Sequence, residues 1–192
     1  MLIVSKVPVR VVARRGNTPD YPTADYLIAP SNVAALEAAS VPEKYWKLNG
    51  PVETCDNVEE MTAAEKTAVD DSAEYLAPEK ARRLAEINDR TDALILLGFE
   101  FPAASGNIFG LTDKDITVWS NLYLAKDLLT FPKIVGTIDF DDYEIADIAA
   151  ATAFYGTGLA TVETHKGAGQ VYRKAVRDAT TRAEVDAVVD TR

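Results

Sequence analysis

The chain has few of the residues that most often carry chemistry. It contains one cysteine, Cys55, and one histidine, His165, among 192 residues. A single cysteine excludes a disulfide framework within one chain and a cysteine-rich zinc site. Cys55 lies between Glu53 and Asp56, whose charges disfavour a reactive thiolate. His165 has no second histidine or cysteine at ligand spacing, so we interpret it as a solvated helix residue, with a general base or metal ligand as the alternative.

Basic residues and long apolar runs are also scarce. Lys and Arg number 20 against 30 Asp and Glu, which gives a net charge of -10. This charge repels phosphate backbones and anionic lipid, so we expect no nucleic-acid partner and no membrane insertion. No run has the length of a membrane span, and the first twelve residues are interrupted by Lys6, Pro8 and Arg10. With 47% hydrophobic residues, the sequence predicts a soluble, folded protein made in the cytoplasm.

The carboxylates cluster at one place, Asp139, Asp141, Asp142 and Glu144. Clustered oxygens can hold calcium, but this run lacks the glycine-bearing spacing of an EF-hand loop, and helix capping accounts for two of its members. A glycan hydrolase is the enzymatic alternative, and it would need Asp139 and Asp142 on either side of a cleft. The sequence has no phosphate-binding glycine loop and no nucleophile elbow. We therefore predict no catalytic residue, no cofactor and no metal.

Residues 1–60 differ from the rest of the chain by holding six of the nine prolines. The spacing of these prolines leaves little room for helices, and short β-compatible runs occur at residues 2–4, 9–13 and 45–48. We predict an extended, β-rich docking arm that cannot fill its own core and lies against a neighbouring subunit or, alternatively, the rest of the chain. Its aromatic residues either fix it to that neighbour or stack on a sugar; they are Tyr21, Tyr26, Tyr45 and Trp46.

Residues 61–98 predict two helices that meet at a kink. Thr62 and Glu65 form a capping box for a helix over 63–76, and Pro78 begins a second helix in a new direction. Apolar residues then recur at helical spacing along one stripe, and Gly98 ends the helix. This stripe includes Leu84, Ile87 and Leu94.

Residues 99–192 predict a third segment of mixed α+β structure. We expect a hairpin of strands at 99–101 and 108–111, a helix from a cap at 112–115 to about 129, and a strand at 133–140 that pairs with the hairpin. An acidic turn at Asp141 then begins a long helix. Thr181 and Glu184 cap a short last helix.

The long helix carries an apolar seam that predicts a partner helix. The seam includes Ile145, Ile148, Leu159 and Val162. Four glycines between residues 156 and 169 each cost about 1 kcal/mol in a helix. The helix therefore either breaks near one pair and resumes at 169 or 170, or uses the glycines to admit a close helix neighbour. The fold class predicted is α+β, an extended β-rich N-terminal arm followed by a helical domain with a small antiparallel sheet.

Several of these segments resemble one known family. The runs at residues 85–88, 91–95 and 98–101 read AEIN, TDALI and GFEF, and residues 62–70 read TAAEKTAVD after YWK at 45–47 and EEM at 59–61. The last helix, residues 179–190, reads ATTRAEVDAVVD. Together they resemble an uncharacterised domain family of tailed-bacteriophage and prophage proteins, many of them tail-fibre or virion-associated. Residues 102–140 depart from the family pattern and are longer.

The resemblance implies where the protein acts, in a phage particle, more than it implies an activity. It implies a non-catalytic structural component of a tailed-phage virion, assembled as a homo-oligomer, with a trimer favoured, and docked on other virion proteins. One alternative is an adhesin that binds a host-surface glycan or protein through residues 102–107 or the arm. Another is a tail-fibre assembly chaperone, which the purified particle would lack. The residues predicted to form interfaces are Tyr45, Trp46, Leu84, Ile87, Leu94, Ile145, Ile148, Leu159 and Val162.

Overall fold

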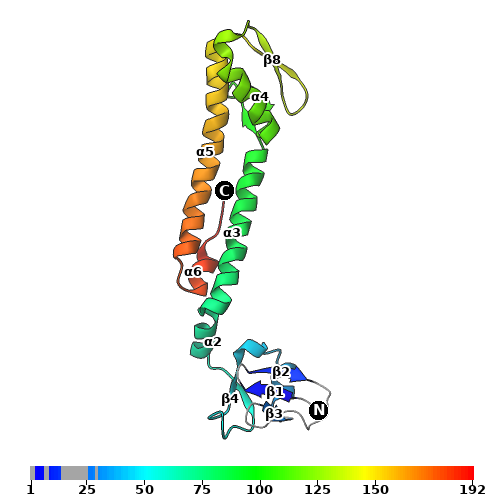
Figure 1. Cartoon of the computed structure of the whole chain (residues 1–192), viewed down its shortest axis with the longest axis vertical. Helices are drawn as coiled ribbons and strands as arrows, with labels where there is room; N and C mark the ends of the chain where they lie inside the picture. Colours follow the sequence, from blue (N-terminus) through cyan, green and yellow to red (C-terminus); the bar gives the residue numbers. More distant parts are fainter. Residues whose placement is uncertain (1–2, 7–8, 14–25, 29) are drawn as a thin grey trace. The chain divides into compact units, whose positions relative to one another are not determined.

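The computed structural model describes residues 3–6, 9–13, 26–28 and 30–192 (Figure 1). The chain divides into two compact units, residues 1–77 and residues 78–192. Both contain helices and small antiparallel sheets, so the predicted α+β class is confirmed. The unit boundary differs from the three segments expected at 1–60, 61–98 and 99–192.

The first unit contains two sheets and short helices. Its three-stranded antiparallel sheet has the order β2-β1-β3, and β4 pairs with β5 in a second sheet. Its elements are β1 (Ile3–Lys6), β2 (Val9–Ala13), β3 (Tyr26–Ile28), α1 (Val33–Ala38), the 3₁₀ turn η2 (Glu43–Tyr45), β4 (Trp46–Leu48), β5 (Val58–Glu60) and α2 (Ala63–Asp70). The strands expected at 2–4, 9–13 and 45–48 correspond to β1, β2 and β4, apart from Leu2, which lies outside the described residues.

This unit has a core of its own, so the expectation that residues 1–60 cannot fill one is wrong. Helix α1, which the proline spacing did not predict, contributes Val33 and Leu36 to that core. The buried cluster consists of Val4, Leu27, Val33, Leu36, Trp46, Cys55 and Val58.

The two helices after residue 60 meet earlier than predicted. The capping box of Thr62 and Glu65 begins α2, as expected. Helix α2 ends at Asp70, and α3 (Ala73–Leu96) begins five residues before Pro78, which therefore lies inside a continuous helix. The predicted helix start at Pro78 is wrong. The interruption falls at residues 71–72, where Ser72 Oγ donates a hydrogen bond to the carbonyl of Val69 at 2.6 Å.

The second unit combines α3 from residue 78 with two hairpins and three more helices. Its elements are β6 (Phe99–Glu100), β7 (Ile108–Phe109), α4 (Asp113–Leu124), the 3₁₀ turn η3 (Lys126–Leu128), β8 (Lys133–Gly136), β9 (Asp142–Ile145), α5 (Ile148–Asp178) and α6 (Arg182–Ala187). The hairpin of β6 and β7 and the capping boxes at Thr112 and Thr181 agree with the predictions.

Residues 133–147 fold differently from the prediction. Strand β8 pairs with β9 in a separate hairpin, and a single backbone bond of 2.9 Å from Ile138 N to Ile108 O joins its end to β7. The acidic run is therefore part of a strand and its turn, and Ile145 belongs to β9. Helix α5 starts at Ile148 instead, where the side chain of Asp147 accepts a hydrogen bond from the Ala150 N–H at 2.7 Å.

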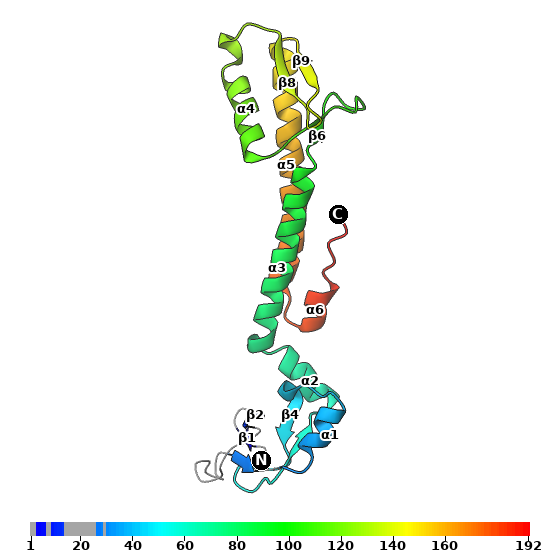
Figure 2. The same cartoon turned by 90° about the vertical axis from the view of Figure 1, so that its right-hand side faces the viewer.

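Helix α5 runs for 31 residues through all four glycines without a break. It lies antiparallel beside α3, as Figures 1 and 2 both show. A Cβ at Gly158 would lie 2.6 Å from Trp119 Cζ3, and one at Gly169 would lie 2.6 Å from Thr91 Oγ1. These two glycines therefore allow neighbouring side chains to approach the helix closely, which was the second of the two alternatives predicted for the glycines. This packing outweighs the low helix propensity of glycine.

Two cores hold the second unit together. One is an aromatic cluster of Phe99, Phe109, Trp119 and Phe154, in which Phe154 lies 4.8 to 5.8 Å from the other three ring centroids. The other is polar and joins α3 to α5 through the last residues of the chain. There Arg192 donates hydrogen bonds to Thr91 Oγ1 at 2.9 Å and to the His165 carbonyl at 2.8 Å.

Candidate functional site

The outer face of the first half of α5 is an uncharged surface of the second unit. Between Ile148 and Val162 the helix carries no charged residue. Its inner side is buried, whereas its outer side is exposed, with Ile148 and Leu159 42% and 43% accessible. The other exposed residues on this side are small and comprise Ala149, Thr152, Ala153, Gly156 and Ala160.

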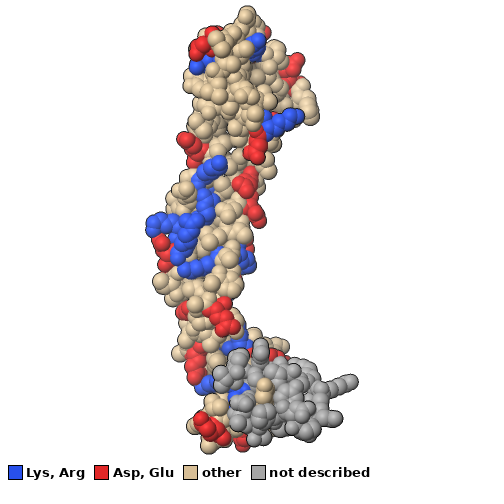
Figure 3. All heavy atoms as spheres, in the orientation of Figure 1, with Lys and Arg blue, Asp and Glu red and all other residues tan. Residues whose placement is uncertain are grey.

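This face is hollowed, because its side chains are short. A shallow depression of about 590 Å³ follows the helix and is lined by Ala153, Gly156, Thr157, Ala160, Thr161, Thr164 and His165. A Cβ placed at Gly156 would meet no atom within 4 Å. Figure 3 shows the same stretch of α5 free of charged side chains, while Lys and Arg gather over the C-terminal half of the helix. The depression therefore has the shape and polarity to receive an apolar ridge of another helix.

Further exposed apolar side chains lie on α4, η3 and the β8–β9 hairpin. Leu128 is 90% accessible, Leu124 76% and Phe140 94%. Ile134 and Ile138 are also largely exposed. Single exposed apolar residues are common on soluble proteins, and a contiguous exposed apolar patch is what marks a contact surface.

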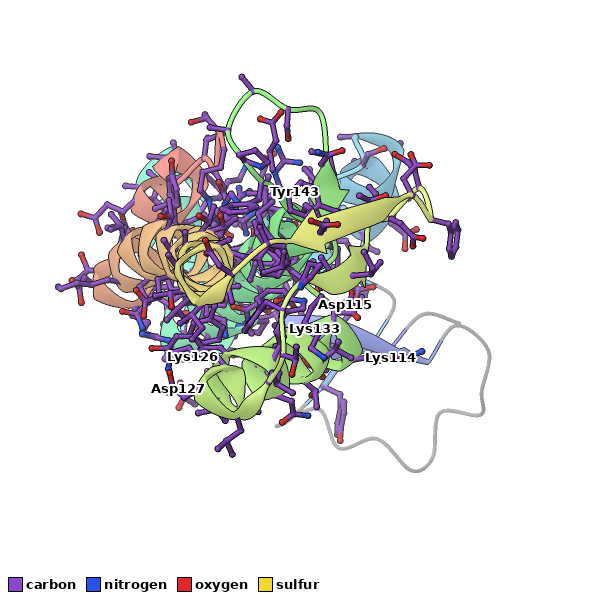
Figure 4. All side chains as sticks on the ribbon, turned by 90° about the horizontal axis from the view of Figure 1, so that it is seen from above. Lys114, Asp115, Lys126, Asp127, Lys133 and Tyr143 are labelled. Carbon is purple, nitrogen blue, oxygen red and sulfur yellow. The ribbon has the colours of Figure 1, made fainter. Side chains whose placement is uncertain are left out.

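Phe140 is held outward by an ordered turn. The turn between β8 and β9 is closed by hydrogen bonds from Thr137 N to Asp141 O at 2.9 Å and from Phe140 N to Thr137 O at 3.1 Å. The Asp141 N–H donates to Thr137 Oγ1 at 3.1 Å. Phe140 has a φ of +67°, a left-handed conformation that disfavours a bulky side chain. In Figure 4 the hairpin extends from the unit on the side away from α5, with Tyr143 on β9 opposite Val135.

The nine predicted interface residues lie in different environments. Trp46, Ile87 and Ile145 are 2%, 1% and 0% accessible and fill the cores of their own units. Leu84, Leu94, Val162 and Tyr45 are half-buried, and only Ile148 and Leu159 are exposed. Ile148 and Leu159 thus lie on the exposed side of α5 with its small residues. The other seven predicted interface residues are buried or half-buried within the chain itself.

Tyr45 has a local role in the first unit. Its hydroxyl donates to Asp70 Oδ2 at 2.7 Å, and Lys44 Nζ lies 2.6 Å from Asp70 Oδ1. The hydrogen bond to Asp70 raises the pKa of Lys44. Nearby, hydrogen bonds from Lys47, which has the larger effect, and from Thr62 lower the pKa of Glu65 to about 2. These contacts attach α2 to β4 and η2, so Tyr45 stabilises the unit. Tyr26 is half-buried in β3, and Tyr21 lies outside the described residues.

Cys55 and His165, which were considered for chemistry, belong to different units of the chain. Cys55 is buried, and its thiol lies 3.4 Å from the Val52 carbonyl. His165 is half-buried on α5 beside small residues and threonines. Residues 3–6, 9–13, 26–28 and 30–192 contain no group of three His, Cys, Asp or Glu placed to hold a metal ion. In the same residues, no helix is both long and apolar enough to cross a membrane.

The sequence analysis missed Leu124, Leu128 and Phe140. Their signal is weak, because a single aromatic residue in an acidic run and two leucines near a helix end are equally compatible with burial. The turn geometry that exposes Phe140 depends on the pairing of β8 with β9, which the sequence analysis did not predict.

Comparison with known proteins adds no relative. No family model matches the chain, and no curated protein and no solved structure is significantly similar to it. A function can therefore be proposed only from the exposed surfaces of α5 and the hairpin and from the resemblance of the sequence segments described above.

Proposed function

We propose that this chain is a non-catalytic structural component of a tailed-phage virion, which acts by associating with copies of itself and docking on neighbouring virion proteins. The virion setting is supported by the resemblance of the sequence segments described above to the phage domain family. The mode of action is supported by one observation, the uncharged and exposed outer face of the first half of α5.

The net charge explains why this face matters. Copies of a chain with a net charge of -10 repel one another, and every carboxylate taken into an interface must lose its water. A face without ions has no carboxylate to desolvate and brings no like charges into direct contact. Its small residues also allow a neighbouring helix to approach closely, while Ile148 and Leu159 supply apolar area to bury. We expect a homo-oligomer of low order, with a trimer favoured.

Charged substitutions on the face test this mechanism. In the full-length protein, Ala153→Glu with Ala160→Glu places two carboxylates one heptad apart on the outer side of α5. The matched control is Ala81→Glu with Ala85→Glu, at two exposed alanines of α3. Size-exclusion chromatography with light scattering should show an oligomer for the wild type and the control, and a monomer for the α5 variant. A wild-type protein that remains monomeric at all concentrations would refute the mechanism.

The virion setting needs a separate measurement. Mass spectrometry of gradient-purified particles should detect the chain as a stoichiometric component. Its absence from the particle, with its presence in infected cells, would favour the assembly chaperone.

Receptor binding is a second candidate, favoured by the loop between β6 and β7. Residues 102–106 are all exposed, and in Figure 2 the loop projects from the rest of the unit. Phe101 N donates to Asn107 O at 3.0 Å, and Gly106 N donates to Glu100 Oε1 at 2.6 Å, so the loop is held in shape. Loss of host-cell binding on deletion of residues 103–105, with the oligomer intact, would establish this role.

A further inference from the structure

The turn that carries Phe140 combines an apolar tip with negative charge. Phe140 is 94% accessible and is flanked by Asp139, Asp141 and Asp142, all exposed. A left-handed φ of +67° is costly for phenylalanine, and glycine or asparagine would adopt it more easily. Strained residues that persist on a surface often belong to functional sites. The turn thus exposes an aromatic side chain that is flanked by three carboxylates.

The C-terminal half of α5 presents the complementary surface. A groove of about 440 Å³ is lined by Gly167, Gln170, Val171, Arg173, Lys174 and Arg177. Val171, at one edge of the groove, is 69% accessible, and a Cβ at Gly167 would meet no atom within 4 Å. The three cations Arg173, Lys174 and Arg177 lie on one side of Val171 around the helix, and Figure 3 shows Lys and Arg side chains gathered over this half of α5.

The cations of the groove are only partly neutralised. Lys174 pairs with Asp178, and both side chains are exposed. Arg173 donates to Asn88 Oδ1 at 3.1 Å, an uncharged partner. The guanidinium of Arg177 has no hydrogen bond or ion pair with any residue in the described part of the chain. In a protein of net charge -10, such a surface attracts an acidic partner.

We propose that the turn at residues 137–141 of one copy docks in the groove at residues 167–177 of a second copy, with Phe140 over Val171 and the aspartates against the cations. The inference rests on the proposed function, in which copies associate. Within one chain the turn and the groove lie apart, because the hairpin is beside the N-terminal end of α5 and extends away from that helix (Figures 1 and 4).

The contact allows two kinds of assembly. Two copies that each place their turn in the other's groove form a closed two-fold dimer, whereas a contact made once per pair of copies is heterologous. Repetition of a heterologous contact closes into a ring or continues as a filament, according to the rotation between copies. The trimer expected above corresponds to a ring of three such contacts.

Cysteine cross-linking of full-length chains tests the contact directly. In a Cys55→Ser background, chains with Ile138→Cys in the turn are mixed with chains that carry Gln170→Cys at the groove. These changes keep Phe140, Val171 and all the charges. We expect disulfide-linked dimers within minutes of mild oxidation, at least about tenfold faster than for the control mixture of Ile138→Cys with Leu97→Cys, an exposed site on another surface. Equal rates for the two mixtures would overturn the proposal.

A second pair of variants separates docking from folding. Phe140→Gly relieves the left-handed backbone, so the variant should unfold at a higher urea concentration than the wild type while its self-association weakens at least about tenfold. Lys174→Glu should weaken self-association similarly, and adding Asp141→Lys to the same chain should restore it by reversing the charges. If both single variants associate like the wild type while Ala153→Glu with Ala160→Glu dissociates, the proposal fails and the proposed function stands. A monomeric wild type would overturn both.

Discussion

Substitution of Gly158 by alanine should destabilise the second unit relative to the same substitution at Gly156. A Cβ at Gly158 would lie 2.6 Å and 2.8 Å from two ring atoms of Trp119 and 3.0 Å from Phe99 Cε1. Carbon atoms in ordinary contact are about 3.5–4.0 Å apart, so the rings would have to move by about 1 Å. At Gly156 the same Cβ meets nothing within 4 Å.

The pair isolates the cost of overpacking. Alanine is favoured over glycine in a helix by about 1 kcal/mol, and this gain is common to the two positions because they are two residues apart in α5. Inserting a methyl group into a filled core costs about 1–3 kcal/mol. Trp119 cannot move freely, because its ring lies 5.2 Å from Phe99 and 5.8 Å from Phe154. We therefore expect Gly156→Ala to gain about 1 kcal/mol and Gly158→Ala to be about 1–3 kcal/mol less stable than that variant.

Urea unfolding followed by circular dichroism at 222 nm measures this difference, at the lowest protein concentration that gives a signal. Trp119→Leu provides a further control, because it removes the ring atoms that the new methyl group would meet. In this background the difference between the two alanine variants should shrink. Equal stabilisation by Gly156→Ala and Gly158→Ala in the wild-type background would refute the packing of Trp119 on α5.

Two further predictions concern the other glycine pair and the acid stability of the first unit. Gly169→Ala should be less stable than Gly167→Ala, because its Cβ would lie 2.6 Å from the buried Thr91 Oγ1 while the Cβ at Gly167 is free, and the same urea assay measures the difference. The folded pKa of Glu65, about 2, lies below its ordinary value of 4.5 because of hydrogen bonds led by the one from Lys47. Its stabilising contribution is therefore complete above pH 4.5 and is lost as the pH falls towards 2. The unfolding midpoints of the wild type and Glu65→Gln should differ at pH 6 and converge near pH 2, and a difference that does not change with pH would contradict the assignment.

Local sequence rules predicted the helix starts that they govern. The capping boxes at Thr62, Thr112 and Thr181 each begin a helix in the structure. Such caps depend on residues three positions apart, so they can be read without knowledge of the fold. The rule for proline failed at Pro78, because a preference for the first helical turn does not exclude a position inside a helix.

Pairings over longer distances could not be read in this way. The run from Asp141 to Ile145 has the acidic residues of a helix start, but Asp142–Ile145 forms a strand opposite Lys133–Gly136, and Ile145 is completely buried. Periodicity likewise identified Ile87 as part of an apolar stripe without indicating whether its own chain or a neighbour covers it. In the structure its own chain covers it. The distinction between core and interface depends on tertiary structure, and so does the exposure of Phe140.

The four glycines of α5 link the packing within the chain to the surfaces proposed for assembly. Gly156 and Gly167 are eleven residues apart, as are Gly158 and Gly169, and eleven residues make about three turns, so each pair lies on one side of the helix. The inner pair is explained by the side chains packed against it. The outer pair costs about 1 kcal/mol per glycine and has no neighbour within the described residues to account for it. Gly156 lies in the uncharged depression and Gly167 in the basic groove, so the same close approach that explains the inner pair would explain the outer pair if other copies dock at both places.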